Sequence, residues 1–263
     1  MWITEGYSVR QLIAISNYGR KKIKRIKNYW LEKVPPALRL TGKHKYLILD
    51  GTYFKRTNCL IVIMDNISDQ IIAGRYCIRE NYAIASSMFR ELLSKQINPK
   101  AVTTDGNTSA ILAIRKIWPD IIIQRCLVHI QRQGLSWLRR FPKSQAAKDL
   151  RLLLLAVTNI RDHKQKQTFI NDFNNWEKRY GKFVLSLPSS DKVFSDLQRT
   201  RSLIIHALPD MFHYLEDSNI ASTTNKAEGY FSRLKEIYRR HRGMSKDKRS
   251  IYFQWHIYFK NIK

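Results

Sequence analysis

The sequence predicts an α/β fold: a mixed five-stranded sheet, a large all-helical insertion and a small helical unit at the N-terminus. Three observations support this fold class. From residue 45 onward, β-rich runs follow one another and then alternate with helical patterns. Beyond residue 125 no strand pattern appears for most of the remaining chain. A Pro-Pro pair closes a basic helical pattern near residue 35. We therefore expect a first domain at 1–36 and a second at 45–263, with its insertion at about 130–220.

The composition indicates a globular protein that binds a polyanion. The chain has 263 residues with 47 Lys and Arg against 21 Asp and Glu, which gives a formal net charge of +26. A charge of this size favours a nucleic-acid partner, because the partner offsets the self-repulsion. Hydrophobic residues make up 44% of the chain and aromatic residues 11%, enough for a packed core. A disordered basic tail is thereby excluded.

The sequence gives no sign of a membrane span or an export signal. The longest apolar run, 152–157, is far shorter than the roughly 20 residues that cross a bilayer. The N-terminus lacks the basic segment and apolar stretch of a signal peptide. Cys59, Cys77 and Cys126 are too few and too scattered for a disulfide framework. We expect a cytoplasmic, nucleoid-associated protein with no membrane partner.

The N-terminal residues predict two short helices joined by a tight break. Ser8 is a suitable N-cap for a helix over 9–15, a break follows at 16–19, and a second helix covers about 20–31. This outline is that of a helix-turn-helix, whose second helix enters the DNA major groove. A solvated amphipathic helix is the alternative interpretation. The candidate DNA-binding residues on the second helix are Arg20, Lys21, Lys22, Lys24 and Arg25.

The next segment predicts the sheet. Strands are expected at 46–54, 58–65, 70–78, 100–104 and 121–123, with helices at 81–95 and 107–118. The short turn formed by Lys55, Arg56 and Thr57 joins the first two strands into a hairpin. Three antiparallel strands followed by two parallel strands reached through helices is the order of a ribonuclease-H-like sheet.

The remaining chain reads as helical. Helices are expected at 135–140, 144–160, 162–180 and 191–215, separated by Pro142, Gly181 and Pro188. A last helix begins after residues 222–225 and carries Ala227, Phe231, Leu234 and Tyr238 as its apolar stripe.

Three acidic residues are candidates for a metal site. Asp50 lies within the first strand and Asp105 at the end of the fourth, and these strands are neighbours in the expected sheet. Glu228, on the last helix, is the candidate third carboxylate of a two-metal site. Each residue also has a simpler explanation. The two aspartates could serve as turn or cap residues, and Asn225 with Glu228 has the form of a capping box.

Several motifs resemble the mutator-like transposases of bacterial insertion sequences, which carry a DDE triad. The resemblance covers about residues 45–243. It rests on Asp50-Gly51-Thr52-Tyr53, Thr104-Asp105-Gly106, Trp118-Pro119, Gln124-Arg125-Cys126-Leu127-Val128-His129 and Thr223-Thr224-Asn225-Lys226-Ala227-Glu228. The resemblance implies that Asp50, Asp105 and Glu228 are the triad. It also implies Mg²⁺ as cofactor, for which Mn²⁺ can substitute, and a helical insertion before the glutamate helix.

The resemblance also assigns roles outside the triad. Cys126 and His129 look like an active-site support pair; a zinc site is the weaker alternative, because such sites need four ligands. Trp176 falls where related enzymes place a base-stacking tryptophan, although its helical spacing with Phe169 and Phe173 also fits a core residue. The basic stretch 233–249 predicts a phosphate track. Its candidate DNA-binding residues are Lys235, Arg239 and Arg240.

The sequence therefore predicts a Mg²⁺-dependent DNA transposase. It would cut transposon ends and transfer the freed 3′-OH to target DNA, acting as a homo-oligomer on DNA. A truncated or vestigial transposase that only binds DNA is the main alternative. A ribonuclease-H-like nuclease acting on RNA–DNA hybrids is weaker, because the helix pair at the N-terminus suits duplex DNA.

Overall fold

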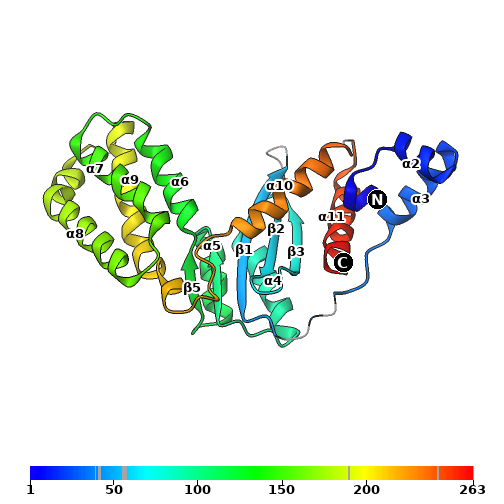
Figure 1. The fold of residues 1–263 in the computed structure, drawn as a ribbon, viewed down its shortest axis with the longest axis horizontal. Coiled ribbons are helices and arrows are strands. Elements are labelled where there is room, and N and C mark those ends of the chain that lie inside the picture. Colours follow the sequence, from blue (N-terminus) through cyan, green and yellow to red (C-terminus); the bar gives the residue numbers. More distant parts are fainter. Residues whose placement is uncertain (39, 41–42, 55–57, 189, 242, 263) are drawn as a thin grey trace. The chain divides into compact units, whose positions relative to one another are not determined.

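The computed structural model describes residues 1–38, 40, 43–54, 58–188, 190–241 and 243–262. The chain divides into two compact units (Figure 1). Unit 1 consists of Met1–Lys100, Thr108–Ile121 and Asn225–Lys263, and unit 2 of Ala101–Asn107 and Ile122–Thr224.

The strands of unit 1 form the antiparallel part of the fold. They are β1 (Tyr46–Phe54), β2 (Asn58–Asp65) and β3 (Ile71–Cys77), in the order β3-β2-β1. All eight residues of β2 are buried, which explains its nearly continuous apolar run. In the register of β1 with β2, Asp50 lies opposite Val62. The turn predicted at Lys55, Arg56 and Thr57 lies outside the described residues.

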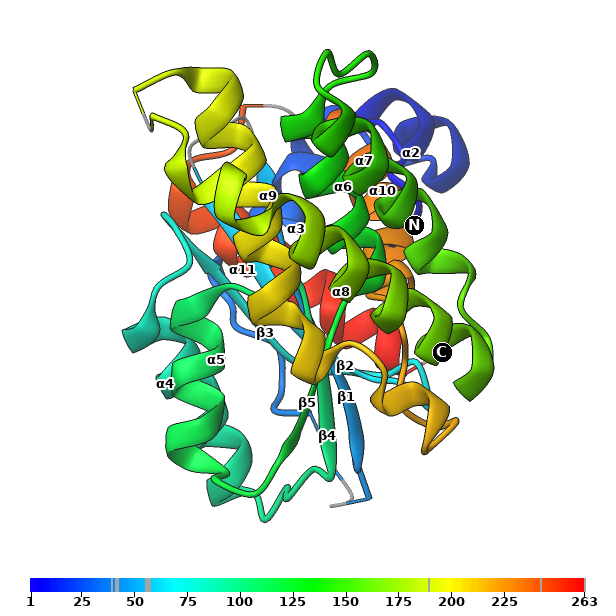
Figure 2. The same ribbon diagram turned by 90° about the vertical axis from the view of Figure 1, so that its left-hand side faces the viewer.

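Four helices of unit 1 accompany these strands. α4 (Tyr82–Ser94) packs against α5 (Thr108–Ile117), and α10 (Asn225–Arg239) packs against β1 (Figures 1 and 2). α11 (Lys246–Asn261) packs against β3, with Tyr252 and Phe253 fully buried. The prediction that the glutamate helix is the last one is wrong. The prediction assigns the basic residues at the start of α11 to a phosphate track. The second half of this helix is aromatic and largely buried.

The N-terminal helices belong to unit 1. They are α1 (Trp2–Glu5), α2 (Val9–Ser16) and α3 (Arg20–Glu32). Ser8 caps α2 as predicted, since its side chain accepts a hydrogen bond from the Gln11 N–H. α1 and α3 contact α11, and the Trp255 Nε1–H donates to the carbonyl oxygen of Trp30 at 2.9 Å. This division differs from the predicted boundary at residue 36, because α11 covers the apolar side of α3.

Unit 2 holds two parallel strands and a helical bundle. The strands are β4 (Ala101–Thr104) and β5 (Ile122–Arg125). The helices, seen together in Figure 2, are α6 (Leu127–Leu138), α7 (Gln145–Ala156), α8 (His163–Ser186) and α9 (Lys192–Ala207). Leu150, Leu154, Phe173 and Ile204 are among the residues of one buried core.

The described part of the chain is thus α/β, with a mixed five-stranded sheet that includes antiparallel and parallel pairs, and many helices. Some helix boundaries differ from the prediction. α6 begins at Leu127 rather than Leu135, and α8 continues through Gly181 to Ser186. In the described part of the chain, no helix combines the length and apolarity needed to cross a membrane.

Candidate active site

Asp50 lies in the middle of β1, opposite Val62 of β2. It is only 5% exposed, and its Oδ1 accepts a hydrogen bond from the Gly51 N–H at 2.8 Å. A buried carboxylate among apolar strand residues is costly unless hydrogen bonds or a cation stabilise its charge. This position in the central part of a strand argues against the interpretation of Asp50 as a turn residue.

Glu228 stands in the first turns of α10, in the same unit as Asp50. α10 is joined to the strand region at both ends. The Lys226 ammonium donates to the Asn66 carbonyl oxygen at 2.6 Å and pairs with Asp69 at 2.8 Å. Near its other end, the Lys235 ammonium donates to the hydroxyl of Thr52. The Asn66 N–H donates to the carbonyl oxygen of Tyr46, the first residue of β1. The Lys226 contact and the Lys235 contact therefore lie on either side of Asp50 along the strand.

Glu228 is the fourth residue of α10, which begins at Asn225, and it is half-buried.

Asp105 directly follows β4 in unit 2 and shapes a tight turn. Its Oδ1 accepts a hydrogen bond from the Asn107 N–H at 2.9 Å, so the predicted turn role is real. Gly106 has φ +98°, a conformation that favours glycine. A Cβ atom at Gly106 would also come within 2.0 Å of the Arg125 guanidinium. Asp105 therefore lies in a turn whose next position, 106, favours glycine.

Arg125 is the charged neighbour of Asp105, and no role for it was predicted from the sequence. It ends β5, is 9% exposed, and its Nη2 lies 3.5 Å from the Asp105 carbonyl oxygen. Its Nε is buried and has no hydrogen-bond partner among the described residues. Burial lowers the pKa of Arg125, while the carboxylates of Asp105 and Asp210 oppose this shift. A charged residue at the end of an apolar strand was the signal that could have identified it.

Cys126 and His129 face each other at the start of α6, where Cys126 is the N-cap. The His129 Nδ1 lies 3.3 Å from the Cys126 Sγ, and the Thr224 N–H donates to the same sulfur at 3.3 Å. Burial opposes ionisation of the thiol, but the hydrogen bonds from His129 and Thr224 lower the pKa of Cys126. The pair thus holds Thr224, the residue immediately before α10.

The segment before α10 has further anchors in unit 2. The Thr103 hydroxyl on β4 donates to the Ala221 carbonyl oxygen at 2.7 Å, and the Leu127 N–H donates to the Ser222 carbonyl oxygen at 3.0 Å. Residues 221–224 are therefore fixed against the strand that precedes Asp105. Support of this segment is the role that the contacts of Cys126 and His129 indicate.

No group of three or more His, Cys, Asp or Glu side chains that could hold a metal ion is gathered among the described residues. For Cys126 and His129 this leaves two ligands, short of the four of a structural zinc site. The three candidate triad residues are divided between the units, with Asp50 and Glu228 in unit 1 and Asp105 in unit 2.

The candidate DNA-binding residues differ in exposure. The five cations on α3, namely Arg20, Lys21, Lys22, Lys24 and Arg25, are exposed, as are Arg239, the last residue of α10, and Arg240, which follows it. Lys235 is half-buried beside Thr52. Trp176 is only 4% exposed, its Nε1–H donates to the Ala146 carbonyl oxygen at 2.8 Å, and its ring stacks on Phe173. These contacts favour the alternative that Trp176 is a core residue.

Comparison with protein families gives the class of the protein. Residues 8–204 match the model of the family described as "Transposase, Mutator family". The chain therefore belongs to the Mutator family of transposases.

Two individual proteins also match parts of this chain. The transposase for insertion sequence element IS905 from Lactococcus lactis subsp. lactis (strain IL1403) is 22% identical over 198 residues. The match covers 71% of this chain and 48% of that protein, so the chain spans about half the length of this relative. A chain in the cryo-EM structure of the simian T-cell lymphotropic virus intasome in complex with PP2A regulatory subunit B56 gamma is 14% identical, with a TM-score of 0.26. That match covers 59% of this chain and 69% of the other, at a TM-score too low to compare the folds.

Proposed function

We propose that this chain is a DDE-type DNA transposase with a ribonuclease-H-like catalytic fold, and that Asp50, Asp105 and Glu228 form its triad. One observation carries the proposal beyond family membership. The Lys100 N–H, just before β4, donates to the Lys45 carbonyl oxygen, just before β1, at 2.7 Å. Asp50 and Asp105 each follow their paired lysine by five residues. Strands that continue side by side from this pair would bring both carboxylates to the same level.

The chain connectivity supports Glu228 as the third member. Residues 221–224 are anchored to β4 and to Cys126, and Glu228 follows Thr224 by four residues. Along a helix, four residues advance only about 6 Å. The support role of Cys126 and His129 follows from this: they would fix the start of the glutamate helix near the strand that leads to Asp105.

The chemistry of these side chains fits a hard divalent cation. All three proposed ligands are carboxylates, whose oxygens suit Mg²⁺ and also Mn²⁺. When bound, the metal would supply Lewis-acid activation of the attacking hydroxyl and of the scissile phosphate. The protein would contribute the ligand positions, while its exposed cations would bind the DNA backbone and orient the phosphodiester. Water would attack first and free a 3′-OH, which would then attack target DNA.

The proposal predicts that Asp50→Asn abolishes Mg²⁺-dependent cleavage of a transposon-end duplex, because the amide no longer supplies an anionic ligand. The affinity for DNA should stay within a few-fold of wild type, since Asp50 is not one of the candidate DNA-binding residues. Strand cleavage on a denaturing gel and binding by fluorescence anisotropy provide the two readouts.

Asp120→Asn is the matched control, because Asp120 is an exposed carboxylate in unit 1 outside the proposed site. It should cleave as wild type does. Cleavage by the Asp50 variant at the wild-type rate would contradict the proposed triad. Loss of both cleavage and binding would indicate a folding defect, which the unfolding curve of the variant would reveal.

A DNA-binding protein without catalysis is the second candidate. The charge of +26 and the exposed cations of α3 favour it, because both support binding but neither supports turnover. Tight binding of transposon-end duplex by wild type, with no cleavage at any Mg²⁺ or Mn²⁺ concentration, would favour this candidate over the transposase.

A further inference from the structure

A basic cavity of about 520 Å³ lies in unit 1, where the N-terminal helices meet the turn between α10 and α11. Among the described residues, four Lys and Arg side chains line it: Lys24 and Lys27 from α3, Arg240 after α10, and Lys248 from α11. We propose that this cavity is a binding site for one phosphate group of the DNA backbone. The inference rests on the proposed function for its choice of DNA as the source of that phosphate.

The charge balance of the cavity favours an anionic ligand. Among the described residues that line it, none is acidic. Arg240 has one nearby carboxylate, Glu236 at 3.8 Å, in a pair that is largely exposed on both sides. Asp247 lies in the first turn of α11 but is exposed and does not line the cavity. Exposed pairs of this kind contribute little, so the positive potential of the four cations is mostly uncompensated.

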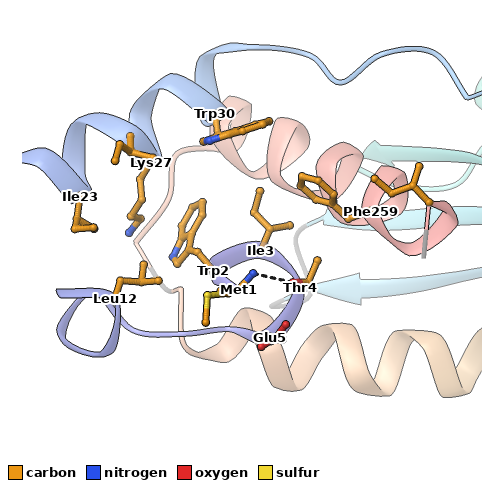
Figure 3. Close-up of a pocket in the computed structure, with 12 residues that line it drawn as sticks. Met1, Trp2, Ile3, Thr4, Glu5, Leu12, Ile23, Lys27, Trp30 and Phe259 are labelled. Atoms are coloured by element: carbon orange, nitrogen blue, oxygen red, sulfur yellow. Dashed lines mark hydrogen bonds between the residues drawn. The ribbon is translucent and has the colours of Figure 1, made fainter. Parts of the chain in front are cut away.

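Lys27 shows most directly that partial burial of a cation without an anionic partner is unfavourable. Its ammonium lies 4.3 Å from the centre of the Trp2 ring, and both residues also line a neighbouring apolar cavity (Figure 3). Burial lowers the pKa of Lys27. Within the described part of the chain, Lys27 forms no ion pair. A phosphate in the basic cavity would stabilise its charged form.

Polar groups around the cations suit phosphate oxygens. The Lys248 ammonium donates to the Asn28 side-chain oxygen at 3.4 Å, which holds it at the cavity. Ser245, the N-cap of α11, accepts the Lys248 N–H and leaves its own hydroxyl hydrogen for a ligand. The cavity therefore combines ammonium, guanidinium and hydroxyl donors, as phosphate sites do.

Sequence separation distinguishes this cavity from an ordinary basic helix face. Lys24 and Lys248 come from opposite ends of the chain and line the same cavity. The site would thus join the predicted DNA-reading helix to the C-terminal helix through one phosphate.

The test uses the full chain, a labelled duplex of transposon-end sequence, and EDTA, so that cleavage does not contribute. Lys24→Gln, Lys248→Gln and the double variant are titrated by fluorescence anisotropy at several salt concentrations. Loss of one phosphate contact reduces the slope of log K against log salt by about 0.9. Between 50 and 200 mM salt, this amounts to about a 3.5-fold change in relative affinity.

Both single variants should lose slope, and the double variant should lose no more than about 0.9, because both lysines contact the same phosphate. Lys116→Gln on α5 is the control: it removes the same charge from an exposed site outside the cavity and should change the slope less. Additive losses approaching about 1.8 for the double variant, or losses equal to those of the control, would overturn the single-phosphate site.

A second arm separates DNA from free phosphate as the source. Thermal unfolding of wild type and of the double variant is compared in sodium phosphate and in sodium chloride of equal ionic strength. Phosphate-dependent stabilisation that the double variant lacks, combined with unchanged DNA affinity, would assign the cavity to free phosphate and overturn the DNA inference. A failure of Asp50→Asn to block cleavage would leave these binding results unaffected.

Discussion

At the scale of single residues, the packing of Arg125 against Gly106 explains how the turn that contains Asp105 keeps its conformation. Gly106 adopts φ +98°, and the Arg125 guanidinium occupies the space that a side chain would need. Arg125 itself is buried and lies beside the Asp105 carbonyl oxygen. The Asp-Gly pair was recognisable in the sequence as a turn, but the arginine that packs on it comes from another strand and was not.

We predict that Gly106→Ala destabilises the chain by about 1–3 kcal/mol, because it strains the backbone and displaces Arg125. Urea unfolding measures the free-energy change. Gly229→Ala, within α10 and with open space at its Cβ position, is the control and should stabilise slightly. Equal, small effects of both substitutions would show that the Asp105 turn tolerates a side chain and that the Arg125 contact is unimportant.

At the scale of elements, most strands and several helices were predictable because their periodicity is clear. β1, β2, β4 and α5 lie at or within one residue of their predicted bounds. Gly181 misled the helix prediction. It lies inside α8 beneath the Glu177 side chain, which pairs with Arg201 of α9. Such helix-to-helix contacts are tertiary and leave no local pattern.

The segment before α10 gives a prediction at this scale. Cys126→Ala removes the sulfur that accepts the Thr224 N–H, which should cost about 1–3 kcal/mol because the amide is left buried without a partner. Since the pKa of Cys126 is lowered in the folded chain, the unfolded chain keeps the proton to higher pH. The stability of wild type should therefore rise relative to the variant as pH increases towards the ordinary thiol value of 9.0.

Urea unfolding of both proteins across this pH range provides the measurement. The difference in unfolding free energy should shrink as pH falls through the lowered pKa of the folded thiol. A difference that does not change with pH would show that the hydrogen bonds from His129 and Thr224 do not stabilise a thiolate.

At the scale of the whole molecule, the sequence predicted an α/β chain with a helical insertion, but not how the chain divides. The three carboxylates come from two separate units, and the N-terminal helices share a unit with α10 and α11. Local periodicity carries no information about such long-range packing. The strand and helix pattern made the three carboxylates candidates, and the resemblance to a family favoured the triad over a turn or cap role for each.

The convergence of three remote carboxylates on one metal site is the central claim. It can be tested by replacing Mg²⁺ with Fe²⁺ and generating hydroxyl radicals, which cut the backbone close to the bound metal. We predict cuts near Asp50, Asp105 and Glu228 together, suppressed by excess Mg²⁺ and lost in Asp50→Asn. Cuts near only one of these residues, or cuts that persist in the variant, would contradict a shared site.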